Sequence, residues 1–234
     1  MSFHPASRSR LTSHDLPRFG GDTLFDRIAR ELCRAECVPR KELYEAWEVA
    51  RRARRRLRGG RVLDLACGHA LVAHLMLLLD DSSPSALAVD AKLPPSAFRV
   101  AACLSSAWPR LAGRITLREA KLDAIDASPG DVVVSCHACG RLTDHVLDKA
   151  IAARAGVAVL PCCQAEAKCD LGGLSGWLDS ALAIDVTRAA KLRASGYAVH
   201  TQTIPANITP KNRLLLGMPD EAPATVVERA APRS

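Results

Sequence analysis

The feature that most constrains the fold is an alternation of short apolar runs with helical segments, which begins at Arg61 and continues to Met218. Such alternation is typical of β-α-β units, whose strands pair in parallel. Only the loop IPANITPK separates the last two apolar runs, so these two strands are expected to form an antiparallel hairpin at one edge. The pattern predicts an α/β fold with a seven-stranded, mostly parallel sheet. Its expected strands are 61–65, 85–89, 114–117, 131–135, 157–160, 198–203 and 212–218, with helices near 70–79, 97–108, 143–154 and 185–195.

Two further helices are expected before the sheet. Thr23 and Asp26 form a capping-box pattern, and apolar residues at helical spacing follow until about Pro39. A second helix is predicted from there to Gly59-Gly60, which ends it. We therefore expect a flexible arm over 1–21, a helical extension over 22–60 that acts as a lid or substrate surface, a cofactor-binding domain over 61–218 and a disordered, Ala/Pro-rich tail over 219–234.

Length and composition indicate a soluble protein with a single core. The chain has 234 residues, of which 48% are apolar, but no apolar run approaches the roughly 20 residues that cross a bilayer. Its start lacks the apolar segment of a signal peptide, so a cytoplasmic location without a membrane partner is expected. Nine cysteines, an odd number, then favour reduced thiols over a disulfide framework.

The segment VLDLACGHA, at the end of the first predicted strand, has the form of a cofactor loop. Asp64 ends the strand and Gly68 allows the backbone to approach a ligand closely. A nicotinamide site would usually show G-x-G-x-x-G, because a pyrophosphate sits against the helix N-terminus. One glycine and one carboxylate fit S-adenosylmethionine (SAM) better, since SAM has no phosphate and carries a positive amino group and sulfonium. The loop therefore favours methyl transfer over hydride transfer.

Asp90 supports this interpretation. It ends the second predicted strand and lies about twenty residues after Gly68, where doubly wound folds place the carboxylate that accepts hydrogen bonds from ribose hydroxyls. The alternative, that Asp64 and Asp90 are only strand-end turn residues, is less favoured for the two together than for either alone.

With these motifs the chain resembles the class I SAM-dependent methyltransferases over Arg61–Met218. The segments DVVVSCHACGRLTD (Asp131–Asp144) and VLPCCQ (Val159–Gln164) are similar to a narrower branch, marked by H-x-C-G-x-L-T-D and P-C-C. That branch includes tRNA ribose 2′-O-methyltransferases and members of unassigned substrate. The resemblance implies a Rossmann-like fold and SAM as cofactor. The sequence shows no zinc-finger segment of the kind found beside the tRNA-modifying members.

Carried over by position, the resemblance implies two groups of site residues. The first would contact SAM along the cofactor loop, at the ribose and beside the adenine, where Lys121, Leu122 or Asp123 makes the contact. The second would lie next to the departing methyl group. The SAM contacts are Asp64, Ala66, Cys67, Gly68, Asp90 and Leu122, and the methyl-side residues are Ser135, Cys136, His137 and Gly140.

His137 is the candidate base, because a histidine accepts a proton near neutral pH; a purely loop-shaping role is an equal alternative. Cys139 and Cys162 follow the fourth and fifth strands, where enzymes that methylate C5 of cytosine carry cysteines, one of which adds to the base. A third interpretation is a metal site, since Cys136 and Cys139 form C-x-x-C and three later cysteines could complete it. Those three are Cys162, Cys163 and Cys169.

Positive charge is concentrated in one stretch. The net charge is +7, and between Arg40 and Arg61 nine basic residues face three glutamates. Arg51, Arg52 and Arg55 of the predicted helix would bind phosphates of RNA, although a solvated charged face explains the pattern equally well. Arg213 lies at the start of the last predicted strand, where it would either close over the acceptor or cap the edge strand. Asp185 and Arg188 are expected to pair within a helix.

The sequence thus predicts a SAM-dependent methyltransferase, with RNA favoured as the acceptor and a small-molecule acceptor left open. The alternative is a noncatalytic protein on the same fold that binds RNA or a cysteine-ligated metal.

Overall fold

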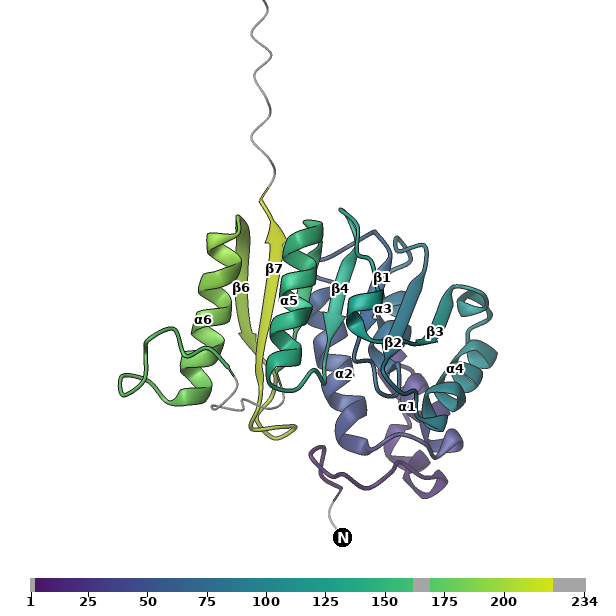
Figure 1. Cartoon of the computed structure of the whole chain (residues 1–234). Helices are drawn as coiled ribbons and strands as arrows, with labels where there is room; N and C mark the ends of the chain where they lie inside the picture. Colours follow the sequence, from purple (N-terminus) through teal and green to yellow (C-terminus); the bar gives the residue numbers. More distant parts are fainter. Residues whose placement is uncertain (1–2, 162–168, 221–234) are drawn as a thin grey trace, which may run out of the picture.

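The computed structural model describes residues 3–161 and 169–220, which form a seven-stranded sheet flanked by helices (Figure 1). The strand order is β3-β2-β1-β4-β5-β7-β6, and all pairs are parallel except β5–β7 and β6–β7. The predicted α/β fold with an antiparallel edge hairpin is therefore confirmed. The strands are β1 (Val62–Leu65), β2 (Ala86–Asp90), β3 (Ile115–Glu119), β4 (Val132–Ser135), β5 (Gly156–Val159), β6 (Tyr197–Thr203) and β7 (Arg213–Pro219).

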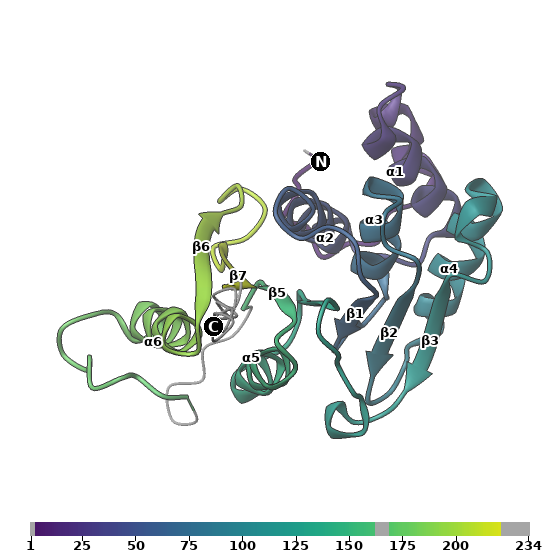
Figure 2. The ribbon, with the colours of Figure 1, turned by 90° about the horizontal axis from the view of Figure 1, so that it is seen from above.

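The helices cover the two faces of the sheet. Viewed from above, α5 and α6 lie on one face, and α2, α3 and α4 lie on the other with α1 outside them (Figure 2). Parallel strands that run outward from β1 in both directions require this arrangement, since each crossover is right-handed. The helices are α1 (Leu24–Ala35), α2 (Arg40–Ala53), α3 (Leu71–Leu79), α4 (Pro95–Ala107), α5 (Arg141–Ala153) and α6 (Ser180–Ala194). Of the predicted helix starts, that of α6 differs most: Asp179 caps the helix, which begins at Ser180, five residues before the expected Asp185.

The N-terminal helices are part of the same core as the sheet. Thr23 caps α1 as predicted, accepting a hydrogen bond from the Asp26 backbone nitrogen at 3.1 Å. Residues of α1 and α2 then share one buried apolar cluster with α3, α4 and the inner strands. The apolar stripe of α2 packs on α3 and on β5, whereas that of α1 packs on α4 and on the 3-10 helix before it, and both stripes stabilise the fold by burial.

The first residues pack as well, which corrects the prediction of a flexible arm. A 3-10 helix spans Ser13–Phe19, and Leu11 and Phe19 are buried. The Phe19 ring meets Phe25 edge-on at 6.0 Å between centroids, and Phe25 in turn contacts Trp47 of α2. Edge-to-face aromatic contacts of this kind stabilise beyond their buried area. The polar composition of the segment concealed these two apolar anchors.

Backbone hydrogen bonds also join the N-terminal segment to the start of α2. Leu11 donates to the Val38 carbonyl at 3.0 Å, and Arg40 donates to the Ser9 carbonyl at 2.9 Å. Lys41 donates to the Ser7 carbonyl at 3.0 Å. This pairing fixes where α2 begins.

Candidate active site

Asp64 lies buried at the end of β1, beneath the start of α3. Its Oδ2 accepts a hydrogen bond from the Ala73 backbone nitrogen at 3.0 Å, while Oδ1 has no hydrogen-bond partner among the described residues. Burial raises the pKa of this carboxyl from 3.8 to about 8; the Ala73 hydrogen bond opposes the rise and the Asp90 charge adds to it. An unpaired acceptor in such a place is costly unless a ligand satisfies it. Asp64 is therefore suited to a positively charged group.

The loop after β1 adopts a backbone that strongly favours small residues. Ala66, Gly68 and Ala70 all have positive φ, at 55°, 52° and 57°. Non-glycine residues in this region cluster at functional sites. A Cβ atom at Gly68 would meet no atom within 4 Å, so the glycine serves its backbone conformation and faces open space. Cys67 is buried beneath the loop, and burial raises its thiol pKa.

Asp90, at the end of β2, braces this loop. Its Oδ2 accepts a hydrogen bond from the Gly68 backbone nitrogen at 2.9 Å. Because each carboxylate oxygen has two lone pairs, Asp90 keeps acceptor capacity for a further donor, such as a ribose hydroxyl.

A cavity of about 200 Å³ opens beside Asp90. It brings together Ala66, Asp90 and Leu122, three of the predicted SAM contacts, and all three candidates for the adenine side line it. The sequence interpretation missed three lining residues, Ala91, Leu142 and His145. Leu142 and His145 lie three residues apart on α5, so their spacing places them on one face of the helix but does not show that this face borders the cavity. The complete lining is Ala66, Asp90, Ala91, Lys121, Leu122, Asp123, Leu142 and His145.

The loop after β4 lies at the same edge of the sheet. Ser135 is buried, and its hydroxyl donates to the Leu65 carbonyl at 2.6 Å, which ties the ends of β4 and β1 together. Cys136 is buried, His137 is half-buried and Cys139 is exposed.

Arg188 holds this loop in place. It is almost fully buried; Nη2 donates to the Gly140 carbonyl at 2.8 Å and Nε pairs with Asp144 at 2.7 Å. Its predicted pairing with Asp185 is confirmed at 3.4 Å. The role toward the loop was missed, because the sequence separation between Arg188 and Gly140 gives no sign of contact.

Glu42 brings the N-terminal helices into the site. Its Oε2 lies 3.1 Å from Nε2 of His69, in the cofactor loop, and 3.9 Å from Nε2 of His137, in the β4 loop. His69 Nδ1 is 2.5 Å from the Ser96 hydroxyl of α4. The sequence interpretation treated Glu42 only as one of three glutamates that offset the arginines.

The cysteine hypotheses are only partly covered by the structure. Cys162 and Cys163 lie outside the described residues, so the covalent role of Cys162 and the thiolate metal site stay predictions. Within residues 3–161 and 169–220, no group of three or more His, Cys, Asp or Glu side chains has the geometry of a metal site.

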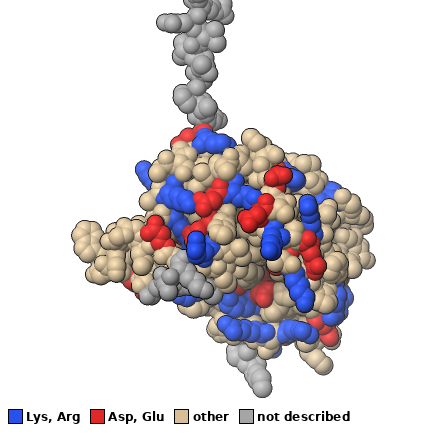
Figure 3. Space-filling model, in the orientation of Figure 1, with Lys and Arg blue, Asp and Glu red and all other residues tan. Residues whose placement is uncertain are grey.

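The predicted phosphate-binding arginines do not form one helical surface. Helix α2 ends at Ala53, and Arg54, in the turn that follows, is buried. Arg51 and Arg52 both pair with Glu48, so only Arg55 of the three predicted contacts is fully exposed. Acidic and basic side chains alternate over the middle of the face shown in Figure 3, and basic ones prevail along its lower edge.

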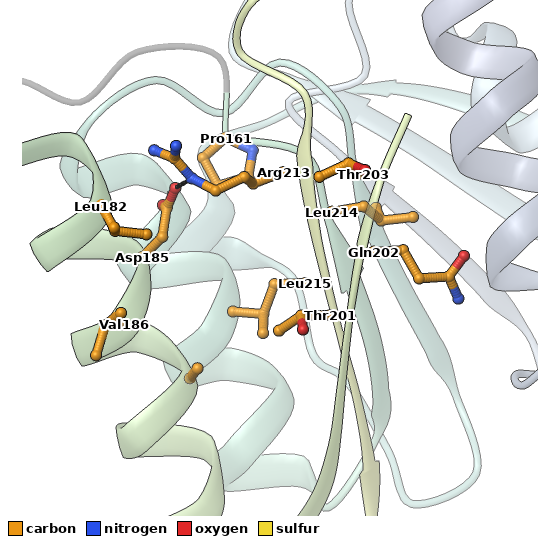
Figure 4. Close-up of a pocket in the computed structure, with 11 residues that line it drawn as sticks. Pro161, Leu182, Asp185, Val186, Thr201, Gln202, Thr203, Arg213, Leu214 and Leu215 are labelled. Carbon is orange, nitrogen blue, oxygen red and sulfur yellow. Dashed lines mark hydrogen bonds and ion pairs between the residues drawn. The ribbon is translucent and has the colours of Figure 1, made fainter. Parts of the chain in front are cut away.

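A larger cavity of about 530 Å³ lies between α6 and the β6–β7 hairpin (Figure 4). Apolar side chains such as Leu182, Val186 and Leu215 form much of its wall. Arg213 Nε pairs across it with Asp185 at 2.7 Å, so Arg213 ties the start of β7 to α6. The cavity reaches Pro161, which follows β5 at the edge of the sheet that carries the β4 loop.

Comparison with known proteins also indicates a methyltransferase. The family model described as "Methyltransferase domain" matches residues 41–170, more than half of the chain. No curated protein matches the sequence.

Two solved structures share the fold. One is an O-methyltransferase family protein from Burkholderia thailandensis, at 19% identity and a TM-score of 0.53, with 91% of this chain and 64% of that chain covered. The other is a ribosomal protein L11 methylase from Lactobacillus delbrueckii subsp. bulgaricus, at 15% identity and a TM-score of 0.50, with 76% and 78% covered. The chain thus spans less than two thirds of the Burkholderia protein.

Proposed function

The chain belongs to the methyltransferase domain family, and on this premise we propose that it transfers a methyl group from SAM to RNA. The observation that carries the cofactor assignment is the buried, unpaired Oδ1 of Asp64 beside a strained small-residue loop. A carboxylate in that position complements the ammonium group of SAM.

The other cofactor contacts follow from the cavity beside Asp90. The Asp90 carboxylate would accept hydrogen bonds from the ribose hydroxyls, and Leu122 would pack against the adenine from the far wall. SAM supplies a methyl group on a positively charged sulfur. The residues after β4, with His137 as the proposed base and Ser135 and Cys136 as the wall beneath it, would position the acceptor.

RNA is favoured as the acceptor because exposed arginines lie close to the candidate site. Arg8 and Arg10 are exposed in the segment that pairs with the start of α2, and Glu42, one turn into that helix, reaches the β4 loop. Phosphate contacts from this side would hold RNA against the cleft. Arg55 lies at the other end of α2, about 20 Å from Glu42 at 1.5 Å per residue, so it would contact a more distant phosphate. Arg51 and Arg52 would add less, because Glu48 offsets their charge.

A cytoplasmic location remains part of the proposal. Buried thiols at Cys33, Cys37 and Cys67 suit a reducing compartment. None of the helices in the described part of the chain is long and apolar enough to cross a membrane.

The apolar cavity favours a second candidate, a small organic acceptor. Its volume of about 530 Å³ falls in the range of small-molecule sites, and it opens next to the end of β5. In this case the arginines would be solvated surface.

Two measurements test these candidates. Calorimetry should show SAM binding to the intact protein, and a folded sample that fails to bind SAM would reject the enzyme. Tritiated SAM should then be incubated separately with total RNA and with a small-metabolite extract. Label in RNA that is sensitive to ribonuclease supports the RNA acceptor, whereas label only in the extract supports the small molecule.

A further inference from the structure

Three side chains from three separate elements meet at the mouth of the candidate active site. Glu42 comes from α2, His69 from the cofactor loop and His137 from the β4 loop, and the Glu42 Oε2 lies within 4 Å of both imidazoles. All three side chains are between 19% and 31% exposed, so they are accessible from the cleft but shielded from bulk water.

The two histidines differ in how many of their ring nitrogens are engaged. His69 has partners on both sides, with Ser96 at Nδ1 and Glu42 at Nε2. It is therefore tethered and has no nitrogen left for chemistry. For His137, Nε2 faces Glu42, and Nδ1 has no hydrogen-bond partner within the described segments. One ring nitrogen of His137 thus stays available.

The Glu42 Oε2 lies 3.9 Å from the Nε2 of His137, which is an ion-pair distance and too long for a hydrogen bond. A carboxylate at this distance acts through its charge: it stabilises the imidazolium that forms when the Nδ1 lone pair takes up a proton. Such an arrangement serves an acceptor that must lose a proton during the reaction, which a hydroxyl must do.

Building on the function proposed above, we propose that the Glu42 charge favours proton uptake by His137, which acts as the base for a hydroxyl acceptor. The acceptor oxygen forms a bond to the methyl carbon as the carbon–sulfur bond of the sulfonium breaks, and the electron pair of that bond stays on sulfur. The hydroxyl proton moves to Nδ1 of His137, and Glu42 stabilises the resulting cation from the Nε2 side. The acceptor class is therefore an alcohol, such as a ribose hydroxyl, rather than a base nitrogen that carries a free lone pair.

The charges around Glu42 support its ionised state. Although burial raises it, the net pKa of Glu42 is lowered by the hydrogen bond from His69 and by the nearby His69, His137 and Lys41. Lys41 itself pairs with Glu45 at 2.5 Å, on the same helix. The groups that face Glu42 are thus the imidazoles of His69 and His137 and the ammonium of Lys41, which also pairs with Glu45.

The variant Glu42→Gln tests the proposal, because it keeps the shape of the side chain and removes only its charge. We expect the ring-proton chemical shifts of His137, recorded by NMR of the full-length protein at pH 7, to change in this variant. SAM affinity, measured by calorimetry, should stay within about twofold. The methylation rate on the labelled acceptor fraction should fall about tenfold to a hundredfold at pH 7, with kcat affected more than KM.

Two further variants make the test specific. Glu42→Asp keeps the charge and should recover part of the lost rate, which a purely structural role would not produce. Glu31→Gln, on α1, removes a carboxylate that pairs with Arg34 and should leave the His137 ring-proton shifts and the rate unchanged.

The possible failures are distinguishable. If the wild-type protein does not bind SAM, the proposed function fails, and this role of Glu42 with it. If SAM binds and methyl transfer occurs, but Glu42→Gln changes neither the His137 ring-proton shifts nor the rate, only the role of Glu42 is overturned. A rate loss that Glu42→Asp leaves unrestored, with unchanged His137 ring-proton shifts, would also overturn it.

Discussion

The Asp90 carboxylate accepts a hydrogen bond from the backbone nitrogen of Gly68 at 2.9 Å, joining the end of β2 to the loop that follows β1. One side chain therefore both shapes the cofactor loop and faces the cavity expected to hold the ribose. Because of this double role, a substitution at Asp90 should weaken SAM binding more than the loss of one ligand contact would.

Replacing Asp90 with alanine should weaken SAM binding about tenfold to a hundredfold, since both the loop brace and a ligand contact are lost. Calorimetry with SAM measures the effect directly. Asp81→Ala is the matched control, because Asp81 is exposed and pairs with the surface residues Arg110 and Arg114. Equal affinities in the two variants would remove Asp90 from the site.

Replacing Asp64 with asparagine should stabilise the unliganded protein at alkaline pH. The carboxyl has a pKa of about 8 when folded and 3.8 when unfolded, so the folded state binds more protons between pH 4 and pH 8. The free energy of unfolding therefore falls as pH rises through this window, and the loss is complete above pH 8. We expect Asp64→Asn to gain about 1–3 kcal/mol at pH 8 over wild type, and nothing near pH 4. Denaturant unfolding at the two pH values measures the difference.

The same variant should fail to bind SAM, because its amide cannot carry the negative charge that complements the ammonium group. A loss of stability at pH 8, instead of a gain, would mark Asp64 as a structural residue.

Arg54 is expected to matter for stability and not for RNA. Its guanidinium is buried, donates to the Met76 carbonyl at 2.9 Å and to the Ser83 hydroxyl at 2.8 Å, and lies 3.5 Å from Asp80. Burial lowers its pKa to about 10. Arg54→Ala should reduce the free energy of unfolding by about 2–4 kcal/mol, because it leaves buried acceptors unpaired. Arg55→Ala, at the exposed neighbouring position, should change it by less than about 0.5 kcal/mol.

Arg8 and Arg10 should account for part of any RNA affinity. Replacing both with glutamine should reduce the slope of log affinity against log salt by about 1.4, at roughly 0.7 per phosphate contact with a single strand. Fluorescence anisotropy with a single-stranded RNA at several salt concentrations gives this slope. Arg51→Gln, which removes an arginine paired with Glu48, should change it little; a larger effect there would place the RNA along α2 instead.

The sheet could be predicted because each of its elements leaves a local pattern. Apolar runs mark β1 to β5, and the loop without a helix marks the hairpin that the structure shows as β6 and β7. Asp64 and Asp90 could be found for the same reason, since strand-end carboxylates at a fixed spacing are local signals. The structure brings both to one loop.

What the sequence did not reveal depends on contacts between distant segments. Glu42 lies on a helix that the periodicity assigns correctly, but only the packing of α2 on α3 brings it to His69. Arg54 is of a residue type that usually lies on the surface. It is buried because α2 ends at Ala53, and neither a glycine nor a proline at that position signals the end of the helix. The packing of the first residues likewise rests on Phe19 meeting Phe25, a contact between two short segments of different type.

Residues 7–11 pair with residues 38–41 and so hold the start of α2 in place. The start of the chain can therefore affect the activity although none of the proposed catalytic residues lies in it. Without that pairing the first turn of α2 would lose its backbone anchors and fray, and Glu42 would withdraw from the two imidazoles. A protease that cuts between Phe3 and Arg10 would therefore lower the activity without removing any residue of the cleft. A binding partner that clamps the same segment would do the opposite.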